Sequence, residues 1–397
     1  MKERQGVASW CAAAAVIVAA VLSGVFAGCG ESDVPVAGGP ATPPGPEERY
    51  AAPGPYPVGN MTLTLTDTAR NRELTVEIWY PAAESARAAA AAGVPVETFF
   101  PAGPQRDQYA ALLAAAPADG PTHVAHAARD AEPEPSGTTW PLLLFSHCHD
   151  CFRFSEFEVA ERLASHGLAV AAPDHAGNTL FDGGAMLNAA FLATRAADIR
   201  FVADTLLAMG TAAGNGLATR IARRFDAARL GVFGHSFGGV TAGRVLQDDV
   251  RFRAGVTMAA PPESPVLPGV KMKNIHQPLV FLVAREDNSI SELGNQLIRG
   301  NFTAANPPVW KIEVADAGHW SFSDICGLTM EFSAGCGDGI RQTVPGQHFH
   351  YLPTATAVPI AQRYITAFFA AQLLGDSGGL DVLGVATPAD LVDVQAR

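Results

Sequence analysis

The sequence predicts an α/β fold with a mostly parallel central sheet and helices on both of its faces. Three mainly apolar segments have the length of buried strands: 140–147, 168–175 and 228–236. Segments with helical periodicity follow them, at 155–167, 192–210 and 238–247. Mainly apolar strands that alternate with helices are typical of a parallel sheet covered on both sides. The 397 residues, 48% of them hydrophobic, are enough to bury a large core.

The remaining elements extend this pattern. Residues 61–67 and 73–81 alternate at period two, which predicts two antiparallel strands at the start of the domain. Further strands are expected at 253–261, 277–287 and 309–319, and the last helix at 358–375. Residues 82–138 are rich in Ala and Pro, and we interpret them as short helices in an insertion over the core, or else as filler that contacts no site. We place the folded domain at 56–376 and a C-terminal tail at 377–397.

The N-terminus has the features of an export signal. Residues 1–28 carry Lys2 and Arg4 before an apolar stretch, as in a signal peptide. The ending "FAGCG" is similar to a bacterial lipobox, in which Cys29 would be the lipidated first residue of the mature chain. Phe26 departs from the Leu usual at that position, so an uncleaved anchor or an ordinary cleaved signal stays open. Residues 29–55, rich in Pro and Gly, would then tether the domain to a membrane in the cell envelope.

The charge balance argues against nucleic acid as a partner. Charged residues make up 17% of the chain, the formal net charge is −12, and no basic run occurs. Binding to phosphates requires clustered Lys and Arg.

Export changes the interpretation of the cysteines. Apart from Cys11 and Cys29, the chain has Cys148, Cys151, Cys326 and Cys336. An even number in an oxidising compartment indicates disulfides. Three pairings are possible, and proximity in sequence favours Cys148–Cys151 and Cys326–Cys336.

The motif Gly234-x-Ser236-x-Gly238 predicts a nucleophile. It lies between a predicted strand and a predicted helix. A sharp turn there would hold the serine in a strained conformation above the sheet, and the glycines leave room for the neighbouring backbone. This context is typical of the α/β-hydrolase fold, in which the order along the chain is serine, acid, histidine.

A serine hydroxyl needs a base, and the base needs an acid to orient it. His319 follows a late strand and is our candidate base, with His348 and His350 as alternatives. Asp287, at the end of the strand 277–287, is the candidate acid, and the adjacent Glu286 is the alternative. Asp174 precedes the serine and is therefore in the wrong order.

Residues 55–376 resemble the type II platelet-activating factor acetylhydrolases and bacterial predicted dienelactone hydrolases. The resemblance rests on "RELTVEIWYPA", "PLLLFSHCHDCFR", "ERLASHGLAVAAPDH", "LGVFGHSFGGVT" and "RFRAGV". It implies that Ser236 is the nucleophile and His319 the base. In those acetylhydrolases the acid follows the strand equivalent to 254–258, where this chain has Ala259. This departure favours Asp287, which follows the next strand.

The resemblance also assigns the loop "SHCHDC". His147 matches a family histidine, and Cys148 replaces a family glycine. His149 then occupies the position whose backbone N–H forms half of the oxyanion hole, and the N–H of Phe237 would form the other half.

These observations lead to a serine esterase without a cofactor or metal, acting on short-chain or phospholipid-like esters. Polyesters and lipase-type substrates fit as an alternative. A second hypothesis is a metal- or thiol-dependent enzyme centred on His147–Cys151, because a CxxC pair with histidines could supply zinc ligands. A third is a binding or scaffold protein that keeps the fold without turnover.

Overall fold

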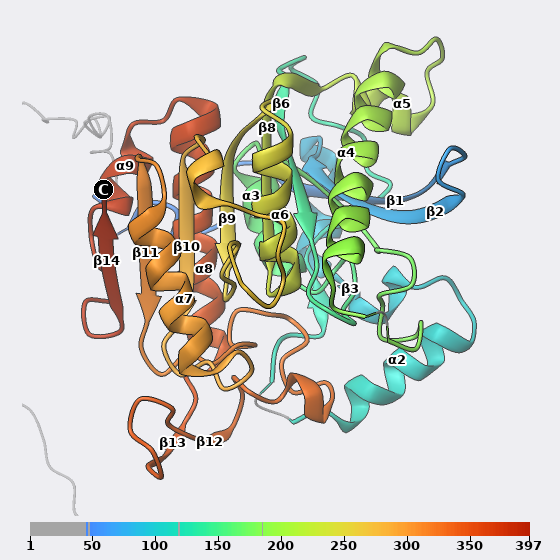
Figure 1. Ribbon diagram of the computed structural model, residues 1–397. Helices are drawn as coiled ribbons and strands as arrows, with labels where there is room; N and C mark the ends of the chain where they lie inside the picture. Colours follow the sequence, from blue (N-terminus) through green and yellow to red (C-terminus); the bar gives the residue numbers. More distant parts are fainter. Residues whose placement is uncertain (1–44, 47, 118–119, 185) are drawn as a thin grey trace, which may run out of the picture. The chain divides into compact units, whose positions relative to one another are not determined.

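A single ten-stranded sheet organises the molecule in the computed structural model, which describes residues 45–46, 48–117, 120–184 and 186–397 (Figure 1). The strand order is β14-β11-β10-β9-β8-β6-β7-β2-β1-β5. The six strands from β11 to β7 in this order run parallel, as the sequence predicts. The strands are β1 (Val58–Asp67), β2 (Arg72–Pro81), β5 (Ala128–Arg129), β6 (Trp140–Ser146), β7 (Ala169–Pro173), β8 (Phe225–His235), β9 (Phe252–Met258), β10 (Leu279–Ala284), β11 (Val309–Val314) and β14 (Val392–Ala396). Two small sheets pair β3 (Val94–Pro95) with β4 (Val124–Ala125) and β12 (Asp338–Ile340) with β13 (His348–His350).

Helices cover both faces of the sheet and bury two apolar cores. On one face lie α3 (Phe157–Ser165), α8 (Thr354–Phe369) and α9 (Gly378–Leu383). On the other lie α4 (Ala189–Thr211), α5 (Leu217–Ala222), α6 (Phe237–Asp248) and α7 (Ser291–Ala304). Figure 1 shows α4, α6 and α7 together in front of the sheet. The other helical elements are η1 (Glu84–Ala86), α1 (Arg87–Ala92), η2 (Val96–Phe99), α2 (Pro104–Ala115), η3 (Met272–Asn274), η4 (Met330–Phe332) and the π-helical η5 (Ala370–Leu374).

The two strands at the start of the domain form the predicted antiparallel pair. Their register runs from Val58 opposite Pro81 to Asp67 opposite Arg72. β2 then pairs antiparallel with β7, which joins the hairpin to the parallel strands.

The C-terminal residues are not a tail. Residues 377–397 form α9 and β14, and β14 pairs antiparallel with β11 at the edge of the sheet. In β14, Val392 is buried, the next two residues are partly exposed and the last two are exposed. The described residues form one compact unit that continues to Arg397, so position 376 is no domain boundary.

The described part of the expected tether also packs on the domain. Tyr50 is buried, and its hydroxyl donates to Asp376. The backbone N–H of Gly54 donates to Oγ of Ser165 at 2.8 Å, in a contact so close that a Cβ on Gly54 would clash with the Ser165 carbonyl. The tether prediction is therefore wrong for residues 48–55. The signal peptide at 1–28 and the lipid site Cys29 lie outside the described residues.

Segment 82–138 is part of the core rather than filler. It contains the expected short helices, and its β5 adds to the sheet beside β1. The ring of Phe99 stacks on that of Phe154 with 4.9 Å between centroids, and the ring of Phe100 meets that of Phe152 at 5.2 Å. The segment therefore supports the chain immediately after the loop 147–151. Among the described residues, no helix has both the length and the apolar composition needed to span a bilayer.

Candidate active site

Ser236 lies at a strained turn between β8 and α6. Its backbone adopts φ 54° and ψ −121°, which is rare for a residue with a side chain. The N–H of Ser236 donates to the carbonyl of Met258 at 2.9 Å, which fixes the turn against β9. A Cβ on Gly238 would clash with the Ser146 carbonyl, and one on Gly234 with the Gly238 carbonyl. The glycines of the motif are therefore required by backbone contacts, as expected for a nucleophile elbow.

The structure brings His319 and Asp287 together. Nδ1 of His319 lies 2.7 Å from Oδ2 of Asp287, and both side chains are buried. Asp287 follows β10, and its other oxygen accepts N–H groups of Ser289 and Ile290, each at 3.0 Å. These bonds fix the carboxylate, which in turn fixes the imidazole. A histidine oriented in this way can take a proton from a hydroxyl through its Nε2.

The alternative acids and bases lie elsewhere. Glu286 binds a different segment: its carboxylate accepts from the N–H groups of Gln342 and Thr343 at 2.8 and 3.2 Å. His348 and His350 lie on β13, and Nδ1 of His350 contacts the exposed Asp338 at 3.0 Å.

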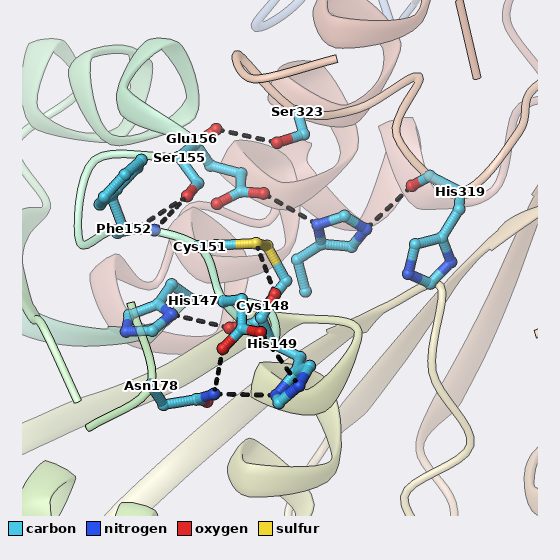
Figure 2. Close-up of a disulfide and its surroundings, with 12 residues drawn as sticks. His147, Cys148, His149, Cys151, Phe152, Ser155, Glu156, Asn178, His319 and Ser323 are labelled. Carbon is cyan, nitrogen blue, oxygen red and sulfur yellow. Dashed lines mark hydrogen bonds and ion pairs between the residues drawn. A yellow bond between two sulfur atoms is a disulfide. The ribbon is translucent and has the colours of Figure 1, made fainter. Parts of the chain in front are cut away.

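The loop 147–151, drawn with its disulfide in Figure 2, leaves the carboxyl end of β6. It lies beside the elbow, because a Cβ on Gly238 would also clash with the His147 carbonyl. His147 is buried, its Nδ1–H donates to the Cys148 carbonyl at 2.7 Å, and its Nε2 accepts the N–H of His175 at 3.0 Å. Burial, together with the nearby Arg195 guanidinium, lowers the pKa of His147 well below its usual value. His147 is thus a neutral, structural residue that orients the loop backbone.

A cavity of about 270 Å³ lies beside the elbow and the loop 147–151. Ser236, His149 and Phe237 line one side of it. The rest of the wall is mainly apolar: Leu187, Val240, Ala259, Ala260, Pro261, Val266, Leu267, Ile290, Leu293 and Leu297. Among the described residues, none that lines this cavity comes from segment 82–138. Such a cavity fits an apolar group next to the hydroxyl of Ser236.

A family model described as "Platelet-activating factor acetylhydrolase, isoform II" matches residues 47–183 and 217–331. The chain belongs to this family. The matched ranges contain Ser236, Asp287, His319 and the loop 147–151. In this acetylhydrolase-family member, Ala259 occupies the place where the resemblance put the acid. It lies in the cavity wall with φ 48°.

A solved structure supports the same fold. The ferulic acid esterase from Streptomyces cinnamoneus is 26% identical, with a TM-score of 0.60, and the match covers 82% of this chain and 93% of that one. No curated protein matches the chain in a sequence comparison. The acetylhydrolase-family protein therefore has the α/β-hydrolase fold, and its family and this neighbour support an ester hydrolase.

Both favoured disulfides are present in this family member. Cys148 pairs with Cys151 (Cα–Cα 5.2 Å) and Cys326 with Cys336 (Cα–Cα 6.1 Å). They indicate folding in an oxidising, extracytoplasmic environment.

Among the described residues, one group has donor atoms close enough for a metal: Cys148, Glu156 and His235, all within 4.8 Å of one another. Cys148 is oxidised and both ring nitrogens of His235 are engaged, so this donor set does not fit a metal ion in the present state.

Sequence reasoning missed His235 and Glu156. Nδ1 of His235 lies 2.9 Å from Oε1 of Glu156, and its Nε2 lies 2.9 Å from the His319 carbonyl oxygen. The rings of His235 and His319 have centroids 4.9 Å apart. The position of His235 beside Ser236 was a possible signal for it, but nothing near Glu156 in the sequence points to this contact.

Proposed function

We propose that this protein is a serine carboxylic ester hydrolase that works through an acyl-enzyme. The observation that carries the proposal is the pair of Asp287 and His319 at 2.7 Å. The His319 ring lies 4.9 Å from that of His235, the residue just before Ser236 on its strained elbow. In this mechanism His319 takes the proton of Ser236 as the hydroxyl attacks the ester carbonyl. Asp287 holds Nδ1–H and stabilises the imidazolium that forms.

The backbone N–H groups of His149 and Phe237 then bind the oxyanion, and loss of one such donor costs roughly 3 kcal/mol of barrier. His319 returns the proton to the leaving alcohol. A water molecule, activated by the same histidine, releases the acid from Ser236.

The cavity supports short-chain or phospholipid-like esters as substrates. Its apolar wall can accept a small acyl group, and the family is named for an acetylhydrolase. The alternative, a polyester or lipase-type substrate, is favoured by three exposed residues at the mouth of the cavity: Leu187 is 49%, Val266 77% and Leu293 66% exposed. Apolar side chains at a mouth can contact a lipid or polymer surface.

A lipid anchor at Cys29 would keep the enzyme at a membrane of the cell envelope. The two disulfides agree with export but do not bear on the anchor itself. Incorporation of labelled palmitate into the protein, and its loss in Cys29→Ala, is the test. Equal labelling of the two proteins would disprove anchoring at this residue.

The function is tested with p-nitrophenyl esters of increasing chain length, with and without micelles. We expect hydrolysis, highest on short chains, and labelling by a fluorophosphonate probe. Ser236→Ala should abolish both. A Ser236→Ala protein that keeps full activity would disprove the mechanism, and higher activity on micellar or polymeric substrate would favour the alternative.

A further inference from the structure

Arg195 is a fully buried arginine behind the loop 147–151. It lies on α4, and its side chain has no exposure to solvent. Among the described residues, no carboxylate lies within ion-pair distance of its guanidinium. Asp198, one turn further along α4, is instead engaged by Arg70, Arg72 and His175. Burying a cation without a paired carboxylate costs desolvation free energy. We therefore looked for a function of Arg195 in its other contacts.

The guanidinium is bound to the backbone of the loop instead. Nη2 donates to the His147 carbonyl and to Oγ of Ser146 at 3.1 Å. Nη1 donates to Oδ1 of Asn178 and, at 3.4 Å, to the Cys148 carbonyl. Nδ2 of Asn178 in turn lies 2.8 Å from Nδ1 of His149 (Figure 2).

The Cys148 carbonyl belongs to the same peptide group as the N–H of His149. In a trans peptide the two point in opposite directions. Because Arg195 and His147 both donate to this carbonyl, the N–H of His149 is directed away from them. Hydrogen bonding at a carbonyl also polarises the peptide and strengthens its N–H as a donor.

The same guanidinium contacts the second proposed donor residue. Its central carbon lies 4.6 Å from the ring centroid of Phe237, in cation–π geometry. The Arg195 side chain thus contacts both residues of the proposed oxyanion hole: the peptide group of His149 and the ring of Phe237. Burial lowers the pKa of Arg195 to about 9, so the group keeps its positive charge at neutral pH.

We propose that Arg195 is a positioning residue for the oxyanion hole: it orients the His149 amide and the Phe237 ring and places a fixed positive charge behind them. This inference rests on the proposed serine esterase function. Arg195 is fully buried and does not line the cavity, so it would act without touching the substrate. Its effect should therefore be on the transition state, in which negative charge develops on the carbonyl oxygen, more than on binding of the neutral ester.

The test compares Arg195→Met and Arg195→Lys with the wild type on p-nitrophenyl acetate. For Arg195→Met we expect kcat to fall about 10- to 100-fold, less than on loss of a direct donor, and KM to change by less than about threefold. Affinity for a trifluoromethyl ketone, which forms an oxyanion adduct, should fall by the same factor as kcat/KM. Arg195→Lys keeps the positive charge but lacks the planar guanidinium with its several N–H donors, so its kcat should lie between those of Arg195→Met and wild type.

Arg224→Met is the matched control. Arg224 also lies 4.6 Å from an aromatic centroid, that of Trp140, but at the other end of β6. The Arg224→Met variant should keep kcat near the wild-type value. Thermal unfolding of all variants shows whether they are folded.

A folded Arg195→Met enzyme with kcat within twofold of wild type, or with only KM raised, would overturn the inference. If Arg195→Met does not fold, wild-type kcat in a folded Arg195→Lys enzyme overturns it equally. A wild-type protein that hydrolyses no ester would instead remove the proposed function itself.

Discussion

Nδ1 of His235 lies 2.9 Å from Oε1 of Glu156, and both side chains are buried. The other ring nitrogen, Nε2, must donate to the His319 carbonyl, because a carbonyl oxygen can only accept. A second proton therefore lies in the hydrogen bond between Nδ1 of His235 and Oε1 of Glu156. Since Glu156 is the residue just before α3, this pair ties the backbone of the candidate base to the start of that helix.

Glu156→Gln should preserve the pair, whereas Glu156→Ala should not. A glutamine can donate its amide to Nδ1, which leaves Nε2–H on the His319 carbonyl. We expect Glu156→Gln to keep esterase kcat within about threefold and Glu156→Ala to lose roughly tenfold or more at similar KM. Glu161→Ala, on the same helix without a contact to these histidines, is the control. Equal activity of Glu156→Ala and Glu156→Gln would show that the pair does not position His319.

Asp287 and Glu286 can be separated by substitution. Asp287→Ala removes the partner of Nδ1 on His319 and should lower kcat roughly 10³- to 10⁴-fold. Glu286→Gln removes only contacts to residues 341–343 and should stay close to wild type. The reverse order of these two activities would assign the acid to Glu286.

The disulfide Cys148–Cys151 should matter for activity more than for stability. It closes a loop of only a few residues, so its effect on unfolded-chain entropy is small. Cys148→Ser with Cys151→Ser should therefore unfold at nearly the wild-type temperature and show a lower kcat. In unreduced, denatured wild-type protein, Cys148, Cys151, Cys326 and Cys336 should not react with a thiol reagent. Their reaction without reductant would contradict both disulfides.

Glu161 should make the protein less stable at alkaline pH. Burial raises the pKa of Glu161 well above its usual value, Glu158 adds to this, and one carboxylate oxygen of Glu161 has no hydrogen-bond partner among the described residues. The folded state therefore favours the protonated acid. The associated stability is present below the unfolded pKa of about 4.3 and is lost as pH rises through the raised folded value.

Glu161→Gln mimics the protonated acid and removes this loss. We expect its melting temperature to equal that of wild type near pH 4 and to exceed it at pH 9 by roughly 2 °C or more. Thermal unfolding across this range measures the difference. If the difference in melting temperature between Glu161→Gln and wild type is the same at every pH, the Glu161 carboxyl has the same pKa in the folded and unfolded states.

Ala260 limits the width of the cavity beside Ser236. It is 2% exposed and lines the apolar wall. Ala260→Leu adds three carbons there, so kcat/KM should fall on butyrate and longer esters and change little on acetate. An unchanged ratio of acetate to butyrate hydrolysis would show that the acyl group binds elsewhere.

Much of this architecture is visible in the sequence because buried parallel strands are mainly apolar runs. The elbow was predictable for a related reason, since its backbone contacts exclude any side chain at Gly234 and Gly238. The position of Asp287 followed from chain order and from the strand end before it. The sequence did not decide between Asp287 and Glu286 as the acid, because neighbouring side chains at a strand end point in different directions. The contacts in the structure separate the two residues.

The remaining features depend on contacts between distant residues. His235 and Glu156 are 79 positions apart, and no periodicity marks such a pair. Arg195 lies in a helix that the sequence predicts. That no described carboxylate forms an ion pair with it appears only when α4 is packed against the loop 147–151. The strand β14 was missed because a short edge strand with a partly polar pattern resembles a tail.

Trp320 stands next to the candidate base, and its ring meets those of His319 and His235 edge-on, with centroids 4.8 and 5.1 Å away. Indole emission responds to neighbouring imidazoles and to exclusion of water. The molecule thus carries its own optical reporter at the point where chemistry would occur. Acylation of Ser236 or occupancy of the cavity could be followed by stopped-flow fluorescence on the native chain, without a chromogenic ester or an added label.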